Sequence, residues 1–86
     1  MNDTNLYAIS YYIFSDFEAV KSSERPEVHG VYTSNERVFD ELEKLQDKHA
    51  KMLEDAGISD IHNSFGLIVS DEVTIEYSVS NVKLYQ

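Results

Sequence analysis

Carboxylates recur at helical spacing in the middle of the chain and are its most distinctive polar feature. The series comprises Glu36, Asp40, Glu43, Asp47 and Glu54. On a helix that advances about 100° per residue, these side chains fall within about 60° of one another. With a rise of about 1.5 Å per residue, the acids from 36 to 47 recur every 5 to 6 Å or so, a spacing loosely like that of charges along a nucleic acid strand. The row could therefore occupy a basic groove that normally holds nucleic acid.

The excess of acid extends beyond this row. The 86 residues include 16 Asp and Glu against 7 Lys and Arg, which gives a net charge of -9. The interval between Lys51 and Lys83 has no basic residue and contains Glu54, Asp55, Asp60, Asp71, Glu72 and Glu76. Because phosphates are bound by clustered Lys and Arg, we expect no direct binding to nucleic acid or to an anionic membrane. We expect instead a host protein with a basic nucleic-acid-binding surface, contacted by the helical acids together with Asp55, Asp71, Glu72 and Glu76.

A solvated helix face is the alternative interpretation of the same row. Asp40 with Lys44, and Asp47 with Lys51, have the acid-first i,i+4 spacing that supports an isolated helix. Helix support does not explain the acids placed in loops and strands. Both interpretations stay open from the sequence.

Residues that could perform catalysis or bind a metal are sparse. His49 falls on the apolar side of the helical pattern, where we expect a partly buried core residue, and no His pair has the i,i+4 spacing of a helical zinc site. The chain has no glycine-rich phosphate loop and no Ser in the context of a nucleophile elbow. We therefore predict a protein that is not an enzyme and that binds neither a cofactor nor a metal.

The acids depend on a helix whose limits can be predicted. Thr33 precedes Glu36 by three residues, which is the spacing of a capping box, and Gly57 is a natural stop. Between them an apolar stripe recurs every three or four residues and predicts one buried face. It comprises Val38, Phe39, Leu42, Leu45, His49, Met52, Leu53 and Ala56.

Strand patterns lie on both sides of this helix. Residues 5–14 read as an internal strand, 15–27 as a long loop, and 28–32 as a returning strand with a bulge or close approach at Gly30. Residues 65–70 and 72–79 form a hairpin that turns at Ser70 and Asp71, after a loop over 58–64. The order β-β-α-β-β predicts a two-layer α+β fold, in which an antiparallel sheet carries one amphipathic helix on one face.

A single helix leaves the other face of such a sheet uncovered. Both parities of the first strand are apolar, so we expect an exposed apolar patch there, with Tyr7, Ile9, Tyr11 and Tyr12 as candidate residues. Patches of this kind typically mark a dimer or partner surface. The alternative function is therefore a structural or regulatory homodimer.

The bulk composition limits where such a protein works. Eighty-six residues fit a single domain, 1–86, and the chain has no cysteine, so a disulfide-stapled secreted domain is excluded. No segment approaches the roughly 18 apolar residues of a membrane span. We expect a protein of the cytoplasm of a host cell.

The run from "GVYTS" into "NERVFDELEKL", after an aromatic-rich strand, resembles small uncharacterised phage and bacterial α+β proteins. The likeness covers roughly residues 7–45. By size and charge the chain also resembles phage-encoded inhibitors of host defence, of the anti-CRISPR and anti-restriction type. The resemblance over residues 7–45 implies the fold and a phage or mobile-element origin, and the likeness in size and charge implies a nucleic-acid-mimicking inhibitor as the function.

Overall fold

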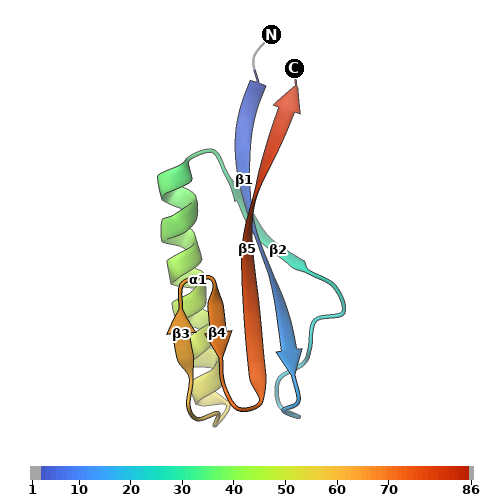
Figure 1. Ribbon diagram of the computed structural model, residues 1–86, viewed down its shortest axis with the longest axis vertical. Helices are drawn as coiled ribbons and strands as arrows, with labels where there is room; N and C mark the ends of the chain where they lie inside the picture. The colour runs from blue at the N-terminus through green and yellow to red at the C-terminus, as the bar shows by residue number, and fades with distance from the viewer. Residues whose placement is uncertain (1–2, 86) are drawn as a thin grey trace.

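One antiparallel sheet and one long helix make up the computed structural model, which describes the backbone of residues 3–85 and the side chains of residues 5–82 (Figure 1). The elements are β1 (Asp3–Ser15), β2 (Glu27–Tyr32), α1 (Asn35–Asp55), β3 (His62–Ser64), β4 (Leu67–Val69) and β5 (Val73–Tyr85). The strand order across the sheet is β2-β1-β5-β4-β3. The predicted α+β class, with a single helix packed on an antiparallel sheet, is confirmed.

The longest strand pairing in the sheet is that of β1 with β5. Both strands have 13 residues, and their register runs without a shift from Asp3 opposite Tyr85 to Ser15 opposite Val73. Since β1 lies between β2 and β5, the prediction that it is internal is confirmed. The two long strands also extend past their shorter neighbours as a two-stranded ribbon (Figure 1).

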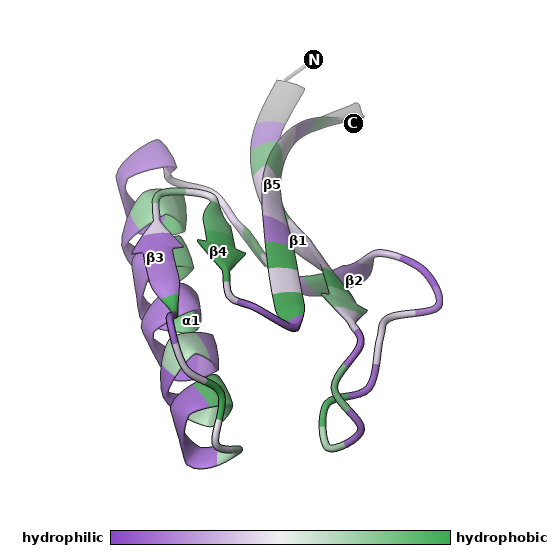
Figure 2. Ribbon diagram, turned by 60° about the horizontal axis from the view of Figure 1, so that its bottom comes forward, coloured by the Kyte–Doolittle hydropathy of each residue, from purple (hydrophilic) through white to green (hydrophobic). Residues whose placement is uncertain are grey.

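The core lies between α1 and one face of this sheet. Ile9 of β1 and Ile75 of β5 are fully buried there, beside Val38, Leu42 and Leu53 of the helix. The polar residues of α1 lie on the side turned away from the sheet (Figure 2). The helix is therefore amphipathic in the way that its sequence pattern predicts.

The structure corrects the predicted uncovered face. Ile9 is in the core, and Tyr7 and Tyr11 pack against that core, so of the four candidates only Tyr12 lies on the far side of the sheet. The cause is the register, which places Ile9 opposite Val79, in the apolar parity of β5. Both parities of β1 are apolar, so its own alternation could not select the covered side.

We call the uncovered side of the sheet the open face. The register assigns it Leu6, Ala8, Ser10, Tyr12 and Phe14 of β1, Val28 and Val31 of β2, His62 and Ser64 of β3, Leu67 and Val69 of β4, and Thr74, Glu76, Ser78, Ser80 and Val82 of β5. Among the described side chains of the open face, Glu76 is the only carboxylate, and there is no Lys or Arg.

The helix begins one residue later than its capping-box spacing predicts. Ser34 is the N-cap, with extended backbone and its Oγ accepting from the N–H of Arg37 at 3.3 Å. Thr33 is thus outside the helix, and the reciprocal bond from Glu36 has no place because Arg37 occupies the third helical position. The predicted stop at Gly57 is confirmed: this residue has φ +91°, and the N–H of Ile58 donates to the carbonyl of Leu53 at 3.0 Å.

The connections around the sheet are more ordered than the sequence suggests. The register shifts where Ile9 and Ser10 face β2, which leaves His29 as an extra residue, and a Cβ at Gly30 would lie 2.7 Å from the Tyr32 Oη. The predicted bulge is therefore present, and the close neighbour of Gly30 is the Tyr32 side chain and not another backbone segment. Residues 16–26 bond back to β1, where the N–H of Ser23 donates to the Ile13 carbonyl at 2.9 Å.

The predicted hairpin is shorter than expected and has a third strand beside it. Ser70 closes the turn before β5, because its hydroxyl donates to the Val73 carbonyl at 2.7 Å. Phe65 is in the turn before β4 and not in the strand itself. The polar segment "HNS" forms β3, which sequence reasoning assigned to a loop. Three exposed polar residues give no apolar alternation by which such a strand could be recognised.

Candidate functional site

The helical acids form one continuous feature, which we call the acidic ridge: Glu36, Asp40, Glu43, Asp47 and Glu54. All are exposed, and they occupy the side of α1 away from its buried residues Val38, Leu42, Leu45, Gln46, His49 and Leu53. The structure therefore places the predicted helical acids together in one row. The row runs the length of a 21-residue helix.

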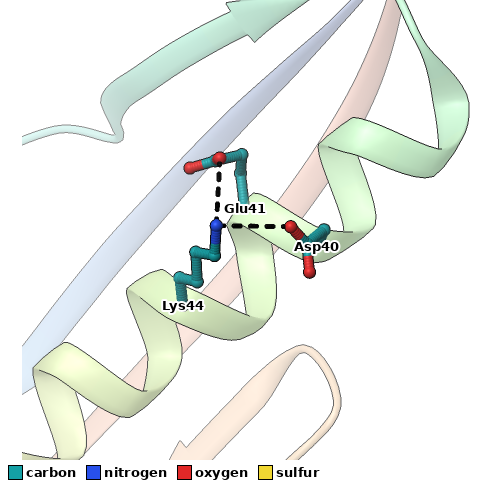
Figure 3. A network of polar contacts seen from close by, with 3 residues as sticks. All are labelled: Asp40, Glu41 and Lys44. Atoms are coloured by element: carbon teal, nitrogen blue, oxygen red, sulfur yellow. Dashed lines mark ion pairs between the residues drawn. The ribbon is translucent and has the colours of Figure 1, made fainter.

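Two lysines of α1 pair with neighbouring acids. Lys44 Nζ lies 3.4 Å from Asp40 Oδ2 and 3.7 Å from Glu41 Oε1 (Figure 3). The predicted Asp40 to Lys44 pair is confirmed, whereas the predicted Asp47 to Lys51 pair is wrong, because Lys51 lies 3.8 Å from Asp55. Such exposed pairs contribute about 0 to 1 kcal/mol each, so an incoming cationic partner can displace them. Glu41 belongs to this network and was not among the predicted site residues.

Asp47 has a different partner, which ties the ridge to the β3–β4 hairpin. The Asn63 Nδ2 donates to Asp47 Oδ1 at 3.3 Å. Next to it Gln46 is buried, its Nε2 donating to Asn63 Oδ1 at 3.0 Å and to the Ser64 carbonyl at 2.7 Å, and its Oε1 accepting from the Gly66 N–H at 2.9 Å. A hollow of about 230 Å³ lies between helix and hairpin here, lined by Glu43, Gln46, Asp47, Asn63, Ser64 and Phe65.

Two aromatic side chains lie beside the ridge, and one of them, Phe65, lines this hollow. Phe65 is 72% exposed and Phe39 is 41% exposed, and their ring centroids are 5.7 Å apart. Phe39 was predicted for the buried helix face, as was Met52, which is 40% exposed. Both predictions are wrong because these two residues are at the margins of the apolar stripe, on either side of the buried residues. The wheel position of Phe39, about 40° from the nearest ridge acid, Glu43, was the available signal.

The other predicted acids are distributed over two more places. Glu54 and Asp55 are at the end of α1, and Asp71 and Glu72 are in the β4–β5 turn at the same end of the long axis (Figure 1). Glu76 is on the open face and therefore on the opposite side of the sheet from the ridge. One rigid partner surface cannot contact Glu76 and the ridge together without wrapping around the sheet.

His49 is a core residue, as its position in the helical pattern predicted. Its Nδ1 is 2.7 Å from the Tyr77 hydroxyl, and the Tyr11 ring meets it edge-on with centroids 4.9 Å apart. Burial, with a smaller effect of the Lys48 charge, lowers the pKa of His49. Burial likewise raises the pKa of the Tyr77 hydroxyl, so the pair is neutral near pH 7.

The described residues contain neither a metal-binding cluster nor a membrane-spanning helix. No group of three or more His, Asp or Glu side chains there is arranged to hold a metal ion. Within the same part of the chain, no helix combines the length and the apolar character needed to cross a bilayer.

Comparison with known proteins adds no identification, since no protein-family model, no curated protein and no solved structure matches the chain.

Proposed function

We propose that this protein is a non-enzymatic inhibitor that uses its acidic ridge to occupy a basic nucleic-acid-binding surface of a host defence protein. The observation that carries the proposal is the row of exposed carboxylates along the outward side of α1. Such a row offers a basic groove the same sign and a loosely similar spacing of charge as a nucleic acid strand. A phage or mobile-element origin fits this role.

The acids at the end of the helix favour the interpretation that the row binds a partner over the interpretation that it only stabilises the helix. The C-terminus of a helix carries partial negative charge, so Glu54 and Asp55 are unfavourably placed there. The last turn contains no basic residue. Lys51 offsets Asp55 in part, and Glu54 has no ion-pair partner among the described side chains. Acids that weaken the helix are better explained by a partner than by stability.

The aromatic pair supplies the apolar contact that a charged surface alone lacks. Phe39 and Phe65 are both exposed and their rings are neighbours, and Phe65 lines the hollow between helix and hairpin together with Glu43 and Asp47. Interfaces are typically dominated by a few aromatic anchors within a polar surround. We therefore expect the partner to place an apolar or cationic side chain against this pair while its Lys and Arg residues contact the ridge.

The test begins with affinity capture from the native host, followed by measurement of whether the captured protein loses nucleic acid binding. A ridge variant, D40S/E43S/D47S, removes three charges from α1. Its matched control, D16S/E18S/E24S, removes three charges from exposed positions in the segment between β1 and β2. We expect the ridge variant alone to lose affinity and to flatten the salt dependence.

Two results would contradict the proposal. One is a ridge variant that binds the same partner with unchanged affinity and unchanged salt dependence. The other is a captured partner whose nucleic acid binding is unaffected by saturating amounts of this protein.

A further inference from the structure

The open face differs from the rest of this acidic chain in its lack of charge. The chain has a net charge of -9, yet the described side chains of the open face include one carboxylate, Glu76, and no Lys or Arg. A sheet face that meets water normally alternates to polar and charged residues. Here, apart from Glu76 and His62, it is built from apolar and hydroxyl side chains.

Large apolar side chains are exposed on both ends of this face. Val28 and Val31 of β2 are 67% and 53% exposed, and Phe14 of β1 is 49% exposed. Val69 and Val82 are also exposed, and the Tyr12 and Phe14 rings lie side by side with centroids 4.5 Å apart. Between the two ends is a hollow of about 380 Å³ whose lining includes Ser10, Ser78 and Ser80. An exposed apolar area of this kind is typical of an interaction surface, although the hollow within it is lined by polar side chains that include Glu76.

Charge decides which occupant fits. A basic partner would find one carboxylate here and many on the ridge, so it would choose the ridge. A second copy of this chain carries the same -9 charge and can approach closely only where carboxylates are few. We propose that the open face is the interface of a homodimer, formed by packing of two sheets face to face.

The geometry of such a dimer keeps the acidic surfaces apart. Packed sheets lie about 10 Å apart, and each α1 adds a layer about 10 Å thick on the outside. The two ridges are then more than about 20 Å apart, beyond the Debye length of about 8 Å at physiological salt, so their repulsion is screened. If the proposed function holds, each dimer presents two ridges in opposite directions and can bind two copies of the target.

The size of the face indicates a weak dimer. The nine residues that each central strand contributes to the face rise about 30 Å. Because β2 flanks one part of this length and β3 with β4 the other, three or four strands lie side by side at any level and span about 14 to 19 Å. Because β3 and β4 are short, the face offers on the order of 400 Å² in projection. Each partner in a standard interface buries about 800 Å² of accessible surface, so we expect association in the micromolar range.

Sedimentation equilibrium of the intact chain between about 1 and 500 µM tests the interface without reference to any target. Ser78→Glu places a carboxylate on the face and should weaken the dimer by about tenfold or more, because each dimer gains two like charges. Glu76→Gln removes the only carboxylate described there and should tighten it severalfold. Ser59→Glu adds the same charge at an exposed position outside the sheet and should change nothing. Thermal melts and circular dichroism establish that each variant is folded.

The outcomes separate the two proposals. A wild-type chain that stays at the monomer mass of 9.9 kDa throughout the range overturns the dimer. Equal effects of Ser78→Glu and Ser59→Glu, or no tightening by Glu76→Gln, would also overturn it by placing the contact elsewhere. Capture of a target by the ridge neither supports nor weakens the dimer, since the ridge is on the other side of the sheet.

Discussion

The outward side of α1 and the open face of the sheet are both exposed, and they handle charge in opposite ways. The helix side carries the acidic ridge, whereas the open face has a single carboxylate among its described residues. If acids served only solubility, they would be most useful on the open face, beside exposed side chains such as Val28 and Phe14. Their concentration on α1 is instead the pattern expected if both proposals hold, in which the ridge and the open face bind different partners.

The largest expected effect distinguishes the covered side of the sheet from the open one. Ile9→Ala removes a fully buried side chain and should lower the free energy of unfolding by about 2 to 5 kcal/mol, from lost burial and the cavity left behind. Val31→Ala, at a 53% exposed position on the neighbouring strand, should cost less than about 1 kcal/mol. Urea denaturation measures both. Similar losses at the two positions would mean that the face assignment is wrong.

A smaller loss of unfolding free energy is expected where the β3–β4 hairpin is hydrogen-bonded to α1. Gln46→Ala leaves the Ser64 carbonyl and the Gly66 N–H without the partners that Gln46 provides, which should cost about 1 to 3 kcal/mol. Amide exchange at Gly66 should accelerate more than exchange at Ile75 in the central strand. Lys48→Ala, at an exposed position of the same helix, is the control and should leave both rates unchanged. Unchanged exchange at Gly66 in the Gln46 variant would contradict the role of this side chain.

The covered side should also respond to pH through His49. Burial lowers the pKa of His49 below its ordinary value of 6.5, so the unfolded chain binds more protons than the folded one as the pH falls. The contribution of this group is fully present above about pH 7.5 and is lost as the pH decreases through 6.5 toward the lower folded pKa.

The measurement is a difference between variants, so that it isolates the contribution of His49 from every other contribution to the pH dependence. The slope of unfolding free energy between pH 7.5 and 5.5 should be shallower in His49→Asn than in the wild type. His62→Asn, at an exposed position on β3, should keep the wild-type slope. Equal slopes in the wild type and His49→Asn would show that His49 is not the responsible group.

The architecture followed from patterns that are local and unambiguous. The alternation of Val73, Ile75 and Tyr77 and the apolar stripe of the helix each have one period and one buried side, so the α+β class could be predicted. The side of β1 that faces the core could not be predicted, because both of its parities are apolar and the covered side depends on its register with β5. Phe39 was misassigned because a helical pattern does not show where the margin of the packed area falls.

The candidate site was predictable in part for the same reason. The ridge acids share one helix, so their spacing sufficed to place them together. Asp71, Glu72 and Glu76 are positioned by the sheet, and no local pattern reveals that Glu76 is on the opposite side from the ridge. The contribution of Phe65 depends on a turn next to a strand, β3, that its polar residues did not reveal.

The smallest predicted effect separates binding from stability within the ridge itself. Glu36 is in the first turn of α1 and Glu54 is in the last, so the helix dipole favours the first carboxylate and disfavours the second. Glu54→Lys should raise the free energy of unfolding by about 0.3 to 1 kcal/mol, and Glu36→Lys should lower it by a similar amount. Both substitutions replace one negative charge of the ridge by a positive one, so both should weaken capture of a basic target despite their opposite effects on stability. If binding instead rises and falls with stability across the pair, the ridge supports the helix and does not contact a partner.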